Sequence, residues 1–538
     1  MKLKPQADWK ILGKPVPRTD MLAKSTGAPI FGIDVRLPNM LYATVRMNPR
    51  LGGKMESLDD AEALKVPGVV KVTRMTGRPE DKLGDGFAVI ASNTWAAFKG
   101  ADAVNVEWGE ATYPATTDKI FEKLETAFTT EGAVSNALDE GDASIAFADA
   151  PRDQIVEAQY SVPFLAHSTM EPMNATAWLR DGKLDIWTGT QGPTLTRSDA
   201  AFEVGVEEEQ VEIHTTYLGG GFGRRSELDF TRFAARVAKA TDGKPVQVVW
   251  TREEDMTHDT YRPGAICKLR AKIDDSGNLA ALEVNASLPS IMASIMGRAL
   301  ETSAMGPDAT MFQGLVDQPY KIENHQVRMA KADVDIPIGF WRSVGHSHNA
   351  YFMEAFMDEL ALKAGKNPLD YRLALLTEHP EAVGVLEKVA EMSNFTAPAE
   401  PGRGKGIAFH LSFGAWTAQV VEVSVNEGVV KIENVWCAAD LGTVLDPAIV
   451  KTQMQSGIIY GLSAAMGQEI TFADGKVEQS NFHDYDAMRM HQCPNIEVEL
   501  LNNSKHMGGA GEPGTPPAVP ALGNAIFAAT GQRLREMP

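Results

Sequence analysis

The sequence predicts an α+β fold, a mixture of short strands and amphipathic helices. Three observations support this prediction. Short β-rich runs recur along the chain, other segments carry apolar residues at helical spacing, and Gly and Pro mark the turns between them. The chain has 538 residues, 44% hydrophobic and 23% charged, so it can bury a large core divided into roughly two to four domains.

The first region, residues 1–115, is predicted to form a small α+β domain. We expect strands in LYATVRM (41–47), GVVKVTRM (68–75) and DGFAVIAS (85–92), and a helical piece around SLDDAEALKV (57–66). Residues 116–150 are rich in Ala, Asp, Glu and Thr and show weaker periodicity. This composition favours a connecting segment.

Residues 151–395 form the next predicted unit. Strands are expected in QIVEAQYSVPF, NATAWL and KLDIWTG, and a second helix near 349–364 with Phe and Met on one face. A clear helix is expected from about Ser226 to Ala240, with Ser226 as its N-cap and Gly243 and Pro245 after its end. The residues on the apolar face of that helix are Phe230, Phe233, Ala234 and Val237.

Residues 396–538 form the last predicted unit. The stretch TAPAEPGRGKG (396–406) is the best linker candidate, because it is rich in Pro and Gly. Strands are expected in AQVVEVSV and VVKIENVWCA, and helices near 450–465 and 521–535.

Charge and cysteine content limit the possible functions. The formal charge is −20, from 51 Lys+Arg against 71 Asp+Glu, so we expect no nucleic-acid partner. Cys267, Cys437 and Cys493 are far apart with no CxxC pair, which indicates buried thiols and no iron–sulfur or zinc site in this chain. Residues 1–30 show no export signal, and the apolar run 458–466 is too short to span a membrane. A cytoplasmic location is therefore expected.

The stretch YLGGGFGRRSE (217–227) places four glycines and a phenylalanine before two arginines. A glycine-rich loop before a helix can bind an anion through free backbone N–H groups. A P-loop, however, needs Gly-Lys-Ser/Thr, and this loop continues with Arg224 and Arg225. A dinucleotide loop would need glycine at position 224. A packing turn with Phe222 in the core beneath it is the simplest alternative.

Five motifs occur in order and together resemble one family. They are HSTMEPMNA (167–175), WTGTQGP (187–193), the glycine loop, GFWRSVGHSHNAYFMEAFMDELA (339–361) and GGAGEPGTPPAVPALGNAIFAATG (508–531). In this order they resemble the molybdenum-binding large subunits of the xanthine oxidase and aldehyde oxidoreductase family, especially those of the isoquinoline 1-oxidoreductase type. The resemblance implies a hammerhead-like α/β domain followed by two mixed α+β molybdenum-cofactor-binding domains, 151–395 and 396–538.

The resemblance also implies which residues lie near the cofactor. The glycine-loop phenylalanine packs beside the molybdenum, the glutamine of the TQ motif contacts a metal oxygen ligand, and the R-x-x-G turn approaches the pterin. The cofactor-binding residues implied here are Gln191, Gly220, Gly221, Phe222, Gly223, Arg342 and Gly511. The protein supplies no metal ligand, because the pterin dithiolene holds the molybdenum.

The glutamate of Gly-x-Gly-Glu-Pro is the general base in this family, which points to Glu512. A carboxylate suits this task because it can take a proton from the attacking oxygen while hydride leaves the substrate carbon. Pro513, Pro516 and Pro517 would restrain the loop that carries the base. The cofactor implied is molybdopterin with molybdenum, in its cytosine dinucleotide form.

Each of these residues has a simpler interpretation. Glu512 could be a surface carboxylate, and Gln191 could bond only backbone. Arg342 could pair with Asp358 or Glu359 on the following helix. Glu171 could line the substrate pocket or satisfy buried backbone. His346 and His348 could suggest a metal, but two histidines at this spacing without further ligands are more typical of loop or surface residues.

The sequence departs from the family pattern in two places. Purine-oxidising relatives carry glutamate four residues after the loop phenylalanine; here that residue is Ser226, which disfavours purines and leaves aldehydes or N-heteroaromatics. No Gly-Gln-Gly segment, which cradles the pterin in the family, occurs in this chain. We therefore expect either another chain that supplies it or a truncated relative.

The resemblance implies partners for electron transfer. They are a small [2Fe–2S] subunit and a cytochrome c beyond it, because this chain has no cysteine cluster. Co-export with a partner would place the complex in the periplasm instead.

The first hypothesis is thus a molybdenum hydroxylase large subunit acting on a small-molecule aldehyde or N-heteroaromatic. The alternatives are a non-catalytic structural or assembly partner of such a complex, and a phosphate-binding protein that uses only the glycine loop.

Overall fold

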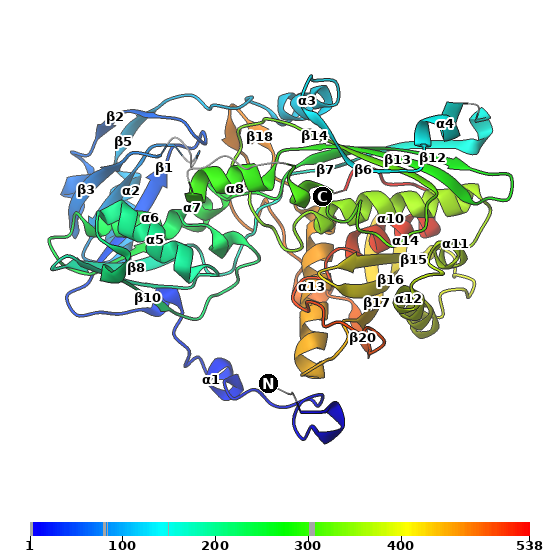
Figure 1. Cartoon of the computed structure of the whole chain (residues 1–538). Coiled ribbons are helices and arrows are strands. Elements are labelled where there is room, and N and C mark those ends of the chain that lie inside the picture. The colour runs from blue at the N-terminus through cyan, green and yellow to red at the C-terminus, as the bar shows by residue number, and fades with distance from the viewer. Residues whose placement is uncertain (1–3, 79–81, 83, 149, 301–306, 538) are drawn as a thin grey trace.

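The computed structural model describes residues 4–78, 82, 84–148, 150–300 and 307–537. It shows an α+β fold in which helices pack on three larger sheets (Figure 1). The predicted fold class is confirmed.

The largest sheet has the strand order β10-β9-β8-β11-β1-β4-β3. Its central contact is a parallel pair between β1 and β11, with Leu41 opposite Val246. Strands from 1–115 and from 151–395 therefore share one sheet. The strand bounds are β1 Leu41–Met47, β3 Val69–Met75, β4 Gly86–Ala91, β8 Asn174–Arg180, β9 Lys183–Thr188, β10 Val211–Thr215 and β11 Val246–Val249.

Helices α5 (Pro193–Val204) and α6 (Asp229–Ala238) lie against this sheet (Figure 1). The expected apolar face of α6 is buried, because Phe230, Phe233 and Val237 are fully covered. The glycine loop enters α6 from strand β10, so this packing fixes where the loop emerges.

The five-stranded sheet has the order β6-β14-β13-β12-β7. Its strands are β6 Val134–Glu140, β7 Ile155–Val162, β12 Ala265–Ile273, β13 Leu279–Leu288 and β14 Asn324–Lys331. Strand β6 belongs to the segment 116–150, which also forms α3 (Thr117–Ala127) and α4 (Ala143–Ala148). This segment holds more regular structure than its weak periodicity indicated, because β6 gains its stability from pairing with the distant β14.

The four-stranded sheet has the order β15-β16-β17-β20. Helix α10 (His346–Lys363) lies between this sheet and the five-stranded one, and nearly all its side chains are buried (Figure 1). A helix covered on every side needs no polar face, so the Phe and Met residues of this segment are core. The strands are β15 Arg403–Ser412, β16 Ala415–Asn426, β17 Val429–Asp440 and β20 Asn495–Leu501.

Helices α13 (Pro447–Gly467) and α14 (Ala518–Thr530) correspond to the last two predicted helices. The remaining elements are short or peripheral. They are α1 Met21–Ser25, α2 Thr94–Asp102, α7 Arg252–Thr257, α8 Ile291–Leu300, α9 Ala309–Phe312, α11 Pro368–Leu375, α12 Pro380–Ser393, β2 Met55–Asp59, β5 Asn105–Trp108, β18 Phe472–Ala473 and β19 Lys476–Val477.

Several local predictions were wrong. Ser226 is not an N-cap: it ends a 3-10 turn over Arg224–Ser226, and α6 begins later with Leu228 as N-cap. The helical piece expected around 57–66 is only partly helical: its first residues belong to β2, which pairs with β5, and a single 3-10 turn follows over Ala63–Lys65. Cys493 is exposed.

The predicted linker is also only partly irregular, because β15 begins at Arg403. Its two strand glycines serve close packing: a Cβ on Gly404 would lie 2.3 Å from the Ala525 carbonyl oxygen of α14, and one on Gly406 would lie 2.2 Å from that of Ala521.

Candidate active site

A cleft of about 590 Å³ brings together residues from the TQ motif, the glycine loop, the Arg342 turn, helix α13 and the Glu512 loop. This volume is typical of small-molecule and cofactor sites. The lining residues are Gln191, Leu218, Gly221, Phe222, Gly223, Ser226, Phe340, Trp341, Arg342, Val344, Gln453, Ser456, Gly511 and Glu512. Of the eight predicted site residues, only Gly220 is outside this lining, one position before Gly221.

Gly223 is the most constrained residue of the glycine loop. Its φ is +114°, and a Cβ there would lie 1.3 Å from the Phe340 carbonyl oxygen. Any other residue would collide with the backbone that forms the opposite wall. The loop and the segment before Arg342 are therefore in direct contact, which brings two motifs far apart in sequence to one site.

Phe222 lies on an aromatic column. Its ring stacks on Tyr460 of α13 at 4.5 Å, and Tyr460 stacks on Trp341 at 4.6 Å. The Tyr460 hydroxyl donates to the His167 carbonyl oxygen at 3.2 Å. Burial raises the pKa of Tyr460 well above its usual value, so this phenol stays neutral. The column fixes the inner wall of the cleft.

The two loop arginines are structural. Arg224 is buried and makes a bidentate ion pair with Asp229, at 2.8 and 2.7 Å. Arg225 is buried and donates to the Gly220 carbonyl at 2.8 Å and to the Glu171 carboxylate at 2.9 Å. Both guanidinium groups stabilise the loop from behind. Neither lines the cleft, which argues against a phosphate-binding role.

Glu171 belongs to the same support. Its carboxylate accepts from the Gly219 N–H at 2.7 Å and the Ile33 N–H at 3.1 Å, as well as from Arg225. It does not line the cleft. Of the two interpretations left open by the sequence, the structure supports the one in which Glu171 satisfies buried backbone.

His167 connects the backbone at Phe340 to the buried carboxylate of Asp259. Its Nδ1 lies 2.9 Å from Asp259 Oδ1 and its Nε2 lies 2.8 Å from the Phe340 carbonyl oxygen. Both neighbours can accept a hydrogen bond from the ring. Although burial opposes it, the charges of His167 and Arg224 lower the pKa of Asp259 and keep it ionised.

Arg342 contacts the Glu512 loop and not the helix that follows it. Its Nε donates to the Gly511 carbonyl at 3.0 Å and its Nη1 to Ser456 Oγ at 3.0 Å. Asp358 pairs instead with Arg533, and Glu359 with Arg535. The suggested pairing of Arg342 with these acids is therefore wrong. Burial lowers the pKa of Arg342.

Glu512 is half-buried at the edge of the cleft. Its Oε1 accepts from the Ser343 N–H at 2.9 Å. Gln191 also lines the cleft and is exposed; its Oε1 accepts from the Gly223 N–H at 3.3 Å. The carboxylate and the amide therefore line the same cleft.

His346 and His348 are neither loop nor surface residues. Both are buried in the first turn of α10, and His346 Nδ1 lies 3.0 Å from His410 Nε2. Burial lowers the pKa of both histidines. In the described part of the chain, the one group of side chains spaced to hold a metal is Asp185, Glu212 and His214, none of which lines the cleft.

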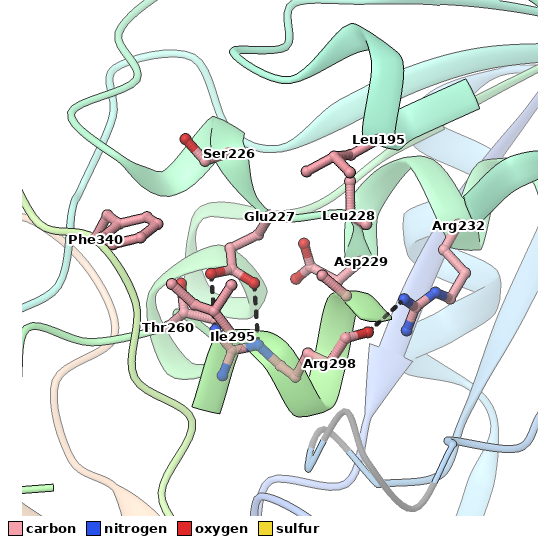
Figure 2. Close-up of a pocket in the computed structure, with 11 residues that line it drawn as sticks. Leu195, Ser226, Glu227, Leu228, Asp229, Arg232, Thr260, Ile295, Arg298 and Phe340 are labelled. Carbon is pink, nitrogen blue, oxygen red and sulfur yellow. Dashed lines mark hydrogen bonds and ion pairs between the residues drawn. The ribbon is translucent and has the colours of Figure 1, made fainter. Parts of the chain in front are cut away.

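A smaller chamber of about 90 Å³ adjoins the cleft and shares Ser226 and Phe340 with it (Figure 2). Its other walls include Leu195, Leu228 and Ile295. The charged groups around it are paired within the protein: Arg298 bonds both oxygens of Glu227, and Arg232 bonds Asp199. Thr260 Oγ1 is buried and has no hydrogen-bond partner among the described residues.

The cleft fits a metallopterin. Its polar lining includes the amides of Gln191 and Gln453, the Ser226 and Ser456 residues, the Arg342 guanidinium and backbone groups, with Glu512 as its one carboxylate. Such a wall suits a large ligand that is rich in hydrogen-bonding atoms. It contains no thiolate or imidazole, so a metal here would need a ligand set of its own.

Comparison with known proteins identifies the family. The chain is 31% identical over 550 aligned positions to isoquinoline 1-oxidoreductase subunit beta of Brevundimonas diminuta, covering 100% of this chain and 69% of that protein. The chain belongs to the xanthine oxidase family of molybdopterin-binding large subunits. The molybdopterin cofactor-binding domain models of this family match residues 127–375 and 311–494.

Other relatives agree with this assignment. The membrane-bound aldehyde dehydrogenase of Gluconacetobacter polyoxogenes is 30% identical and covers 100% of this chain and 73% of its own length. Quinoline 2-oxidoreductase from Pseudomonas putida 86 superposes with a TM-score of 0.82 at 15% identity, covering 98% of this chain and 97% of its own. Aldehyde oxidoreductase from Desulfovibrio gigas gives 0.81 at 18% identity, with 100% and 80% covered. The solved structures establish the shared fold.

Sequence reasoning missed part of the cleft wall. Gln453, Ser456 and Tyr460 all come from α13, at spacings of three and four residues, which places them on one helical face. This polar and aromatic stripe along one face of the helix was a usable signal. Ser343 carried no signal, because its two hydrogen bonds to Glu512 depend on the conformation of the turn and on a segment 169 residues away. Among the described residues, no helix has the length and apolar character needed to cross a membrane.

Proposed function

We propose that this protein is the large subunit of a molybdenum hydroxylase that oxidises an aldehyde or a neutral N-heteroaromatic compound. The observation that supports this most strongly is that four of the five separated motifs line one cleft together, with Glu512 as the single carboxylate in its lining. When bound, the molybdenum–pterin group would supply the water-derived oxygen and accept two electrons. The names of two relatives, isoquinoline 1-oxidoreductase subunit beta and membrane-bound aldehyde dehydrogenase, agree with oxidation of an N-heteroaromatic compound or an aldehyde.

Glu512 would act as the general base. It is half-buried and held at one oxygen by the Ser343 N–H, so its orientation is set before a substrate arrives. Gln191, Gly220, Gly221, Phe222, Gly223, Arg342 and Gly511 would hold the cofactor. Gly511 is exposed and a Cβ there would meet nothing within 4 Å, so this stretch of backbone is open to a ligand.

The chamber beside Ser226 supports a neutral substrate. Its arginines already bond Glu227 and Asp199, so an anionic substituent would find no unpaired cation there. Its apolar walls suit a ring or alkyl group, and the Thr260 hydroxyl could bond one heteroatom. Isoquinoline-like compounds and neutral aldehydes fit this description better than an anionic nicotinate.

Electrons must leave the site through another chain. Cys267 and Cys437 are buried and Cys493 is exposed, and the sequence spaces the three far apart. We propose a small [2Fe–2S] subunit as the acceptor, a cytochrome c beyond it, and a further polypeptide segment that supplies the Gly-Gln-Gly element. The cofactor would be the cytosine dinucleotide form.

The test is to purify the protein together with its partners and measure molybdenum, pterin and turnover. We expect molybdenum in the complex, and Glu512→Gln to lose turnover while retaining the metal. Glu422→Gln is the matched control, because Glu422 is also half-buried but lies on β16, paired with Arg403. A complex without molybdenum, under conditions that load a known relative, would support the non-catalytic alternative.

A further inference from the structure

The turn at 342–345 and the loop at 511–514 form one hydrogen-bonded unit, although they lie 169 residues apart. Ser343 contributes two contacts: its N–H donates to Glu512 Oε1 at 2.9 Å, and its hydroxyl donates to the Glu512 carbonyl oxygen at 2.9 Å. Arg342 adds two bonds to the preceding carbonyl, that of Gly511. Both the carboxylate and the backbone of Glu512 are therefore held by the same turn.

The backbone of this turn is unfavourable for its residues. Ser343 has φ +77° and Val344 has φ +50°, two consecutive non-glycine residues in the left-handed region. A β-branched residue such as valine rarely adopts this conformation. Such strain persists only where the surroundings impose it, and it concentrates at functional sites.

The surroundings of the turn explain how the strain is maintained. The Val344 N–H donates to the Trp341 carbonyl at 2.7 Å, and the Ser347 hydroxyl donates to the Val344 carbonyl at 2.7 Å. Ser343 and Ser347 are both buried. In this conformation the Ser343 N–H is not used by α10, which begins at His346, and is donated to Glu512 instead.

We propose that Ser343 is a positioning residue for Glu512, and that the strained turn exists to present its N–H and hydroxyl to the catalytic loop. This rests on the proposed function, in which Glu512 accepts a proton. Oε1 is occupied by the Ser343 N–H, while Oε2 has no hydrogen-bond partner in the described parts of the chain. Oε2 is therefore the oxygen left to take the proton.

Two variants separate the contributions of Ser343. Ser343→Ala removes the hydroxyl and keeps the N–H. Ser343→Gly also removes the hydroxyl. In addition it frees the backbone to leave the observed conformation, because glycine populates positive and negative φ about equally. Ser347→Ala is the matched control: it removes a buried hydroxyl from the first turn of α10 that does not contact Glu512. The Val344 carbonyl that this hydroxyl bonds still accepts from the Ser347 N–H at 3.2 Å, so the 342–345 turn keeps that anchor.

The first measurement is hydrogen–deuterium exchange of the 508–515 segment in the purified chain, which needs no cofactor. We expect faster exchange in Ser343→Gly, a smaller increase in Ser343→Ala, and none in Ser347→Ala. Unchanged exchange in both Ser343 variants would overturn the proposal, whatever the reaction catalysed.

The second measurement is kinetic, on the molybdenum-loaded complex. We expect Ser343→Gly to lower kcat about 10- to 100-fold with KM and metal content unchanged, since small misplacement of a catalytic group has effects of this size. Faster exchange of the 508–515 segment with an unaltered kcat would contradict positioning. A wild-type complex that lacks molybdenum and turnover would count against the proposed function instead.

Discussion

Replacement of Gly223 by alanine should destabilise the folded protein and reduce cofactor binding in the cleft. The added Cβ would lie 1.3 Å from the Phe340 carbonyl oxygen, 2.5 Å from its carbon and 3.0 Å from His167 Nε2. The carbonyl cannot move freely, because it accepts the His167 hydrogen bond at 2.8 Å. The φ of +114° adds a backbone penalty for any residue with a Cβ.

The magnitude follows from these two effects. Overpacking costs about 1–3 kcal/mol and an unfavourable backbone conformation roughly 1–3 kcal/mol, so we expect a loss of about 2–6 kcal/mol. Urea titration followed by tryptophan fluorescence measures this loss, and metal analysis of the co-purified complex should show less molybdenum.

Gly205→Ala is the control for the backbone penalty. Gly205 has φ +77°, also outside the usual range, but a methyl group added there would have nothing within 4 Å. The reasoning would be refuted if Gly223→Ala were no more destabilising than Gly205→Ala, since the clash with Phe340 would then cost nothing.

Three further changes test other parts of the site. Ile295→Phe should fill the chamber beside the cleft. We expect KM for a bicyclic heteroaromatic to rise about 10-fold or more and KM for a two-carbon aldehyde to stay unchanged. Equal effects on the two substrates would contradict the proposal that the chamber holds the substrate ring. Arg342→Lys keeps the charge but loses the forked contacts to Gly511 and Ser456, so we expect faster exchange of the 508–515 segment and lower kcat. Burial lowers the pKa of His325 to about 4, below its usual 6.5. The unfolded chain then binds the proton more readily, so stability falls as pH drops from about 6.5 to 4, by up to about 3 kcal/mol. His325→Gln should reduce this acid sensitivity in urea titrations at pH 7 and pH 4.5.

Local sequence patterns predicted the elements whose residues favour that structure without help from distant segments. Strand β1 was predicted with its observed bounds, because LYATVRM alternates and has a turn on either side. Strand β6 was not found, because VSNALDE is mostly exposed and is a strand only through its pairing with β14. Ser226 resembled an N-cap, but the buried partners of Arg224 and Arg225 draw the chain into a 3-10 turn before α6 begins.

At the site, too, the sequence predicted some features and not others. The motifs indicated that Gln191, Phe222, Arg342 and Glu512 belong to one family of sites, and the structure places all four around one cleft. Their roles in binding and catalysis stay predictions. The motifs did not show that the loop arginines point away from the cleft, since a guanidinium beside glycines is equally consistent with an anion site.

The fold class, the family and the residue types that the chemistry needs could all be predicted from the sequence. The reason is that periodicity and the order of motifs are properties of neighbouring residues along the chain. The tertiary structure alone decided that Ser343 holds Glu512, that Tyr460 stacks on Phe222, and that Glu227 neutralises Arg298 beside the cleft. These are contacts between distant segments. Their hydrogen bonds and clashes depend on distances of a few tenths of an ångström, which only the packing of the sheets and helices sets.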